Sequence, residues 1–180
     1  MSNTVIHSGK MLKSGMKVVC TQGDSKNTKA KAVFEFKDAI PHPDLLKANM
    51  ALVPHFAILC GGVKMEEIKA VGAKGKKAPT FADKEAAENF RVTGITVTEK
   101  SGMLTITGQH FTEFSGWITQ NVKVTPPQTD EEDAGYPFID DMEEKFNLVA
   151  AEYAQFIENG KHGEDPQQKL DFPEDEKPEE

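Results

Sequence analysis

Apolar and polar residues alternate along three consecutive segments in the second half of the chain, at residues 90–99, 102–114 and 117–125. Alternation with a period of two is typical of β-strands that bury one face and expose the other. Residues 100–102 and 115–116 carry Gly and Ser, which favour turns. The pattern predicts three antiparallel strands joined by short turns.

A similar pattern near the N-terminus predicts a hairpin. Residues 16–22 and 30–36 have strand composition, and residues 23–27 between them have turn composition. A shorter strand around Val5 and Ile6 is expected to precede the hairpin.

The period changes after the hairpin, where a helix is predicted. Pro43 suits the first helical turn. The apolar positions then recur at helical spacing, at Leu46, Met50, Val53, Ala57 and Cys60. Further apolar residues cover most of the remaining surface, which is typical of a buried helix. Pro54 is expected to kink or divide this helix, and residues 61–62 to end it.

The remaining segments are assigned from composition. Residues 64–80 are rich in Lys and Gly and are predicted to form a flexible basic loop, followed by a short helix at residues 82–88. After the acidic segment 130–135, an apolar stripe predicts an amphipathic helix that ends at residues 159–160. The stripe consists of Met142, Phe146, Val149, Tyr153 and Phe156. No internal repeat is visible in the sequence.

These elements together predict an α+β fold for residues 1–161. It contains an antiparallel sheet, a buried central helix and an amphipathic C-terminal helix. The strand order is compatible with an OB-like barrel. Residues 162–180 are polar and punctuated by Pro, so they are predicted to be a disordered acidic tail.

Charge separates the body from the tail. Residues 1–125 carry 17 Lys and Arg against 11 Asp and Glu, whereas residues 126–180 carry 4 against 18. A basic body with an acidic arm favours nucleic-acid binding, because the arm can occupy the basic surface until a polyanion displaces it. The alternative is an arm that only confers solubility.

Two groups of residues are candidates for nucleic-acid contact. Flexible cations that could track a phosphate backbone occur at Lys26, Lys29, Lys31, Lys74, Lys76 and Lys77. Aromatic rings on which bases could stack occur at His110, Phe111, Phe114 and Trp117, with Phe111 and Trp117 the preferred candidates. Alternation of the strand predicts that either Phe111 or Phe114 is buried. The alternatives are solvated loops and ordinary core aromatics.

Apolar residues interrupt the tail at one place, with the spacing Gln-x-x-Leu-x-Phe over Gln167, Leu170 and Phe172. Isolated anchors in a polar segment are typical of peptides that dock in a partner's groove. The pattern resembles the clamp-binding peptides of bacterial replication proteins. The resemblance implies that Gln167 begins the motif and that Leu170 and Phe172 fill a pocket of a sliding clamp. The alternative is a coincidence of composition.

The overall plan, a small β-rich body followed by an acidic tail, resembles bacterial and phage single-stranded DNA-binding proteins. The resemblance implies a protein without catalysis that binds single-stranded DNA in replication or recombination and recruits a partner through its tail. A phage source would fit it.

Other classes of protein receive less support. No phosphate loop, nucleophile elbow or metal-ligand helix is present, so we expect neither an enzyme nor a resident cofactor. The five His are scattered and the two Cys, Cys20 and Cys60, form no CxxC pair, so no metal site is expected. Apolar segments are too short to span a bilayer, and buried thiols fit a reducing compartment such as the cytoplasm.

Two further hypotheses stay open beside single-stranded DNA binding. One is a protein-binding adaptor or inhibitor whose acidic arm mimics DNA. The other is a small enzyme without a recognisable signature.

Overall fold

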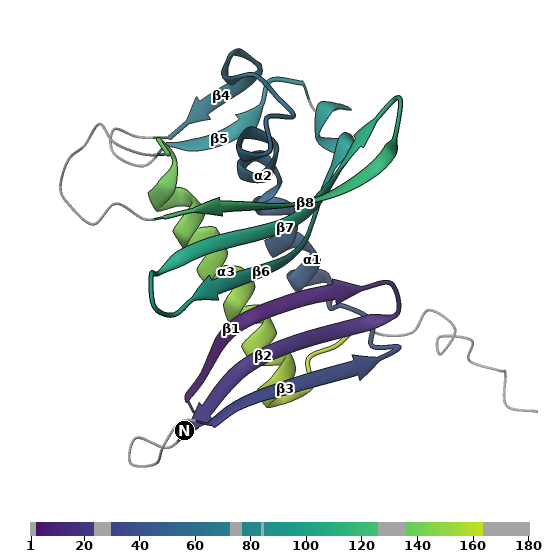
Figure 1. The fold of residues 1–180 in the computed structure, drawn as a ribbon, viewed down its shortest axis with the longest axis vertical. Coiled ribbons are helices and arrows are strands. Elements are labelled where there is room, and N and C mark those ends of the chain that lie inside the picture. Colours follow the sequence, from purple (N-terminus) through teal and green to yellow (C-terminus); the bar gives the residue numbers. More distant parts are fainter. Residues whose placement is uncertain (1–2, 24–29, 73–76, 84, 126–135, 164–180) are drawn as a thin grey trace, which may run out of the picture.

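The computed structural model describes residues 3–23, 30–72, 77–83, 85–125 and 136–163. The predicted α+β class is confirmed. Six antiparallel strands form one sheet in the order β3-β2-β1-β6-β7-β8, and helices cover one of its faces (Figure 1). The strands are β1 (Asn3–Leu12), β2 (Gly15–Gly23), β3 (Ala30–Lys37), β6 (Phe90–Thr98), β7 (Met103–Thr112) and β8 (Gly116–Val124).

The sheet is open, with β3 and β8 as its edges. Among the described residues no pairing joins these two strands, so the barrel that the strand order allowed is not formed. β1 is also longer than the short strand predicted around Val5 and Ile6. It pairs with β2 along its length and with β6 through Ser8, Gly9 and Lys10. These three residues break the apolar alternation, so the sequence pattern concealed the strand that joins the two halves of the sheet.

The central helical region is divided, as Pro54 predicts, into α1 (Pro43–Ala51) and α2 (Val53–Leu59). The predicted apolar stripe is wrong in α1, because Leu46 and Met50 are 42% and 70% exposed. Leu45 and Asn49 are buried instead. The buried positions Leu45, Asn49, Leu52 and Phe56 keep helical spacing through the break, so in α1 the buried stripe lies one residue before the predicted one.

The described parts of the predicted basic loop, residues 64–72 and 77–80, contain regular structure. β4 (Ile68–Val71) and β5 (Ala78–Phe81) pair as a separate hairpin after the 3-10 turn η1 (Met65–Glu67). The short helix expected at 82–88 is the 3-10 turn η2 (Glu85–Asn89).

The long C-terminal helix α3 (Ile139–Asn159) crosses behind the sheet (Figure 1). The predicted stripe is confirmed, because Met142, Phe146, Val149, Tyr153 and Phe156 are all buried. Tyr153 lies over Gly9 so closely that a Cβ there would overlap its ring, and Phe56 lies similarly over Gly108. The two glycines therefore mark the helix-covered face of the sheet.

The sheet consists of two equivalent halves, each a three-stranded meander followed by a helix. β1, β2 and β3 lead to α1, and β6, β7 and β8 lead to α3. The strand order 3-2-1-6-7-8 relates the halves by a pseudo-twofold axis at the Gly9–Ile95 pair. A bulge lies two residues before each member of this pair, at His7 and at Thr93. This structural repeat is not visible in the sequence.

No helix in the described ranges is both long enough and apolar enough to cross a membrane.

The Gly9 contact gives a stability prediction. Gly9→Ala should lower the free energy of unfolding by about 1–3 kcal/mol, because the new methyl group must displace the Tyr153 ring. Lys10→Ala, one residue away on the opposite face, should change it by less than about 0.5 kcal/mol. Urea denaturation followed by circular dichroism measures both variants. Equal effects of the two substitutions would contradict the packing of α3 on β1.

Candidate nucleic-acid interface

The face of the sheet opposite the helices carries the charged residues of the strands. The cross-strand register places all six cations of these strands on this open face: Lys10, Lys17, Lys31, Lys37, Arg91 and Lys123. Glu35 is the single acidic residue within the same six strands. The open face is therefore predominantly cationic although the whole chain has a net charge of −8.

Part of this charge is uncompensated. Lys10 stands directly opposite Lys17, and like charges in such a cross-strand pair repel each other. Lys17 forms an ion pair with Glu35. In the part of the chain that the structure describes, Lys10, Arg91 and Lys123 have no acidic partner. An anionic ligand would relieve this repulsion.

An aromatic cluster lies at one end of the open face. Phe111 on β7 stands opposite Trp117 on β8, with ring centroids 5.7 Å apart in an edge-to-face arrangement. The Arg91 guanidinium lies 3.9 Å from the centroid of the Trp117 ring, a cation–π contact. Phe111 and Trp117 are 46% and 37% exposed. The cluster combines aromatic surface with a cation, as stacking sites for single strands do.

The other predicted aromatics lie elsewhere. His110 is on the helix-covered face, where its ring centroid is 6.4 Å from that of Phe90. Phe114 is 99% exposed in the turn between β7 and β8. The prediction that one of Phe111 and Phe114 is buried is therefore wrong. Phe114 lies beyond the end of β7, where strand alternation no longer applies.

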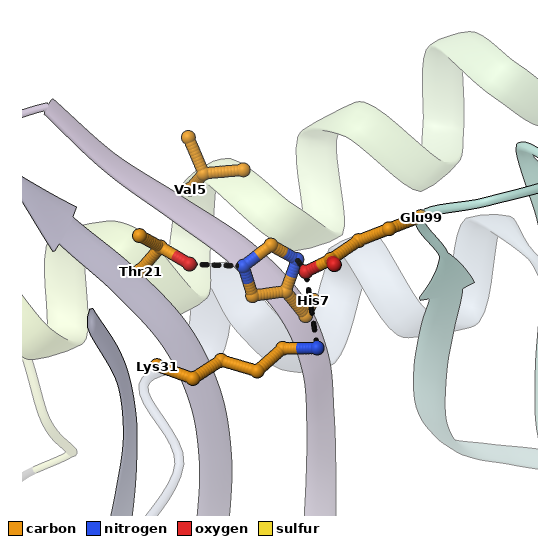
Figure 2. A pocket seen from close by; sticks show the side chains of 5 residues that line it. All are labelled: Val5, His7, Thr21, Lys31 and Glu99. Carbon is orange, nitrogen blue, oxygen red and sulfur yellow. Dashed lines mark hydrogen bonds and ion pairs between the residues drawn. The ribbon is translucent and has the colours of Figure 1, made fainter. Parts of the chain in front are cut away.

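A hollow of about 340 Å³ lies toward the opposite end of the open face. Figure 2 shows its lining residues: Val5, His7, Thr21, Lys31 and Glu99. His7 Nδ1 and Lys31 Nζ each lie 3.0 Å from Glu99 Oε1, and His7 Nε2 is hydrogen-bonded to the Thr21 hydroxyl. The hydrogen bond from Lys31 lowers the pKa of Glu99, so this carboxylate is ionised at neutral pH.

The two predicted lysines that the structure describes, Lys31 and Lys77, are exposed and lie far apart. β3, which carries Lys31, and β5, which follows Lys77, lie at opposite ends of the molecule in Figure 1, so these lysines do not line one groove. Lys26, Lys29, Lys74 and Lys76 lie outside the described residues, as do Gln167, Leu170 and Phe172.

Sequence reasoning missed five cations of the open face: Lys10, Lys17, Lys37, Arg91 and Lys123. A signal was present for the last four, since each of them alternates with apolar residues in its strand. The Lys-rich composition of the loops pointed to nucleic-acid contact there instead.

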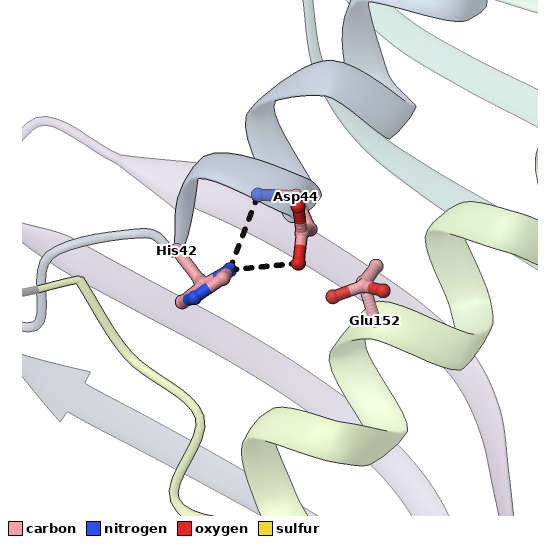
Figure 3. A group of neighbouring side chains, drawn as sticks. All are labelled: His42, Asp44 and Glu152. Carbon is pink, nitrogen blue, oxygen red and sulfur yellow. Dashed lines mark hydrogen bonds and ion pairs between the residues drawn. The ribbon is translucent and has the colours of Figure 1, made fainter.

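A second polar cluster contains His42, Asp44 and Glu152, whose possible metal-ligand atoms lie within 4.8 Å of one another (Figure 3). The Lys161 ammonium lies 2.9 Å from Asp44 Oδ2 and 2.8 Å from Glu152 Oε2. The hydrogen bonds to Glu152 and Asp44 raise the pKa of Lys161. Lys161 thus supplies the cation that these carboxylates require, and the cluster fastens the end of α3 to the start of α1.

This cluster also determines where the chain leaves the body. Gly163 N donates a hydrogen bond to Ile40 O at 2.8 Å, three residues after β3 ends. Gly163, the last described residue, therefore lies beside the segment that follows β3.

A third polar cluster is a buried hydrogen-bond network around His55. Its Nδ1 lies 2.9 Å from the Tyr136 hydroxyl and its Nε2 lies 2.8 Å from Asp141 Oδ2. Lys145 also bonds to this Asp141 oxygen. His55 is completely buried. Both of its ring nitrogens are satisfied, so the network connects α2 to the start of α3 and presents no accessible reactive group.

Comparisons with protein-family models, with curated proteins and with solved structures find no match to this chain.

The His55 network makes stability dependent on pH. Burial lowers the pKa of His55 from 6.5 to about 4. Between pH 6.5 and pH 4 the unfolded chain binds more protons than the folded protein does. The stability that neutral His55 contributes is therefore complete above pH 6.5 and is lost as the pH falls toward 4. This difference corresponds to about 3 kcal/mol.

Chemical denaturation at pH 7.5, 6 and 5 tests this expectation. His55→Gln retains a donor and an acceptor but removes the titration. The variant should be less stable at pH 7.5 and should lose less stability on acidification than the wild type. Parallel pH profiles for the two proteins would show that His55 does not control acid stability.

Proposed function

We propose that this protein binds single-stranded DNA on the open face of its sheet and performs no chemistry on it. The observation that carries the proposal is the composition of that face, where six cations and an exposed aromatic cluster accompany two acidic residues, Glu35 and Glu99. Lys and Arg bind phosphates and release counterions. Aromatic rings stack on bases with little dependence on sequence.

The geometry of the face favours a single strand over a duplex. Six strands at about 4.8 Å spacing make a surface roughly 24 Å wide between the edge strands. Bases in a duplex are stacked on one another and leave no free ring face for Trp117 or Phe111. An extended single strand can place its phosphates along the cations and its bases on the aromatic cluster.

The acidic tail has two proposed roles. Because Gly163, which precedes the tail, is hydrogen-bonded to Ile40 three residues after β3 ends, the tail can compete with DNA for the open face. Once displaced, Gln167, Leu170 and Phe172 would recruit a replication protein such as a sliding clamp. Competition with DNA and recruitment of a partner both fit a cytoplasmic protein of replication or recombination.

The second candidate function is a protein-binding adaptor or inhibitor with a DNA-mimicking arm. Exposed large apolar side chains on the open face favour it: Val5, Leu12, Val33, Phe111 and Trp117. The excess of cations among them favours a polyanion. Capture of a protein partner by the wild type, without any oligonucleotide binding, would support the adaptor instead.

Fluorescence titration with a labelled 15-nucleotide oligo-dT, at low and moderate salt, tests the interface. Trp117→Ala should weaken binding by about 1–3 kcal/mol at both salt concentrations, because it removes stacking. Lys123→Ala should weaken binding mainly at low salt and reduce the salt dependence, because it removes one phosphate contact.

Phe114→Ala is the control, since it removes an even more exposed ring that lies outside the open face. Its affinity should equal that of the wild type. An RNA oligonucleotide of the same length tests the choice of DNA. A wild-type protein that fails to bind at low salt would refute the proposed function.

Removing residues 164–180 tests competition by the tail. The truncation removes eight acidic residues and two lysines while retaining the Lys161 and Gly163 contacts. Affinity for the oligonucleotide should rise, and the gain should shrink with added salt because the competition is electrostatic. Equal affinities of the two proteins at low salt would exclude autoinhibition.

A further inference from the structure

The hollow at His7 and the aromatic cluster at Trp117 occupy equivalent positions in the two halves of the sheet. Gly9 and Ile95 form the pair on the pseudo-twofold axis. Val5 lies four residues before Gly9, and Arg91 lies four residues before Ile95. Thr21 stands opposite Val5 as Gln109 stands opposite Arg91. The axis therefore relates the two places, and they lie at diagonally opposite ends of the open face.

The chemistry of the hollow differs from that of a phosphate site. The Glu99 carboxylate repels a phosphate, and its ion pair with Lys31 leaves this pair without net charge. The Glu99 carboxylate oxygens accept hydrogen bonds from N–H groups, while the Thr21 hydroxyl can donate or accept them. Val5, 42% exposed, supplies an apolar wall. Donors, acceptors and an apolar wall in about 340 Å³ match the edge and face of one nucleobase.

One strand of nucleic acid can reach both places. Because His7 and Thr93 are bulged, six ladder positions separate the two places along the strands. Six residues at about 3.3 Å and three strand spacings of about 4.8 Å give a diagonal of roughly 25 Å. Lys10 and Lys17 lie between the two places, in strands β1 and β2. A separation of this size falls within the site of about 4–16 nucleotides covered by single-strand-binding domains.

We propose that the hollow lined by Val5, His7, Thr21, Lys31 and Glu99 is a second base-binding subsite for the strand that stacks on Trp117. The subsite takes a base with an exocyclic amino group, such as cytosine, because the Glu99 carboxylate accepts hydrogen bonds and cannot donate them. This inference rests on the proposed single-stranded DNA binding.

Titrations with eight-nucleotide oligo-dC and oligo-dT test the subsite. The wild type should bind oligo-dC about fivefold more tightly than oligo-dT. Glu99→Ala should abolish this preference. Glu35→Ala is the matched control, since it removes the same charge from the same face away from the hollow and should retain the preference.

Length gives a second measurement. A three-nucleotide oligo-dC, too short to span the diagonal, should bind the wild type at least about tenfold more weakly than the eight-nucleotide form. Glu99→Ala should reduce this difference, and Glu35→Ala should not.

The outcomes separate this inference from the proposed function. Equal wild-type affinities for oligo-dC and oligo-dT would overturn the subsite while leaving DNA binding intact. Retention of the preference in Glu99→Ala, or its loss in Glu35→Ala as well, would also overturn it. Failure of the wild type to bind either oligonucleotide at low salt would instead overturn the proposed function.

Discussion

Three residue pairs between β1 and β6 join the two halves of the sheet, and the remaining architecture depends on this seam. Gly9 and Ile95 form its central pair. The absence of a side chain at Gly9 allows the Tyr153 ring to lie directly on the backbone, so α3 packs across the place where the pairing is shortest. A narrow seam without this helix would leave two meanders with separate, incomplete cores.

Packing all of α1, α2 and α3 on one face leaves the other face bare. The open face can therefore carry charge without the cost of burying it. Lys10 and Lys17 stand opposite each other there although this repulsion weakens the sheet slightly. An arrangement that costs stability and is not required by packing is expected at a surface selected for binding.

The pseudo-twofold symmetry adds a second level of organisation to this surface. Equivalent positions in the two halves carry different chemistry, with Arg91 and Trp117 at one end and His7 and Glu99 at the other. A polymer that crosses the axis meets a stacking site and a polar hollow in succession. Specialised halves of this kind allow one small sheet to bind an extended ligand along its whole diagonal.

The sequence by itself determined the positions of β2 and β3 and of the second meander, the division of the central helix at Pro54 and the buried stripe of α3. Each follows from local periodicity or from one residue's backbone chemistry. Tertiary structure alone decided the β1–β6 seam, the open sheet and the internal repeat, because pairing between distant strands leaves no periodic signal at Ser8 or Gly9. It also decided the candidate interface. Arg91 and Trp117 come together across three strands, and Glu99 reaches His7 from a turn more than ninety residues away.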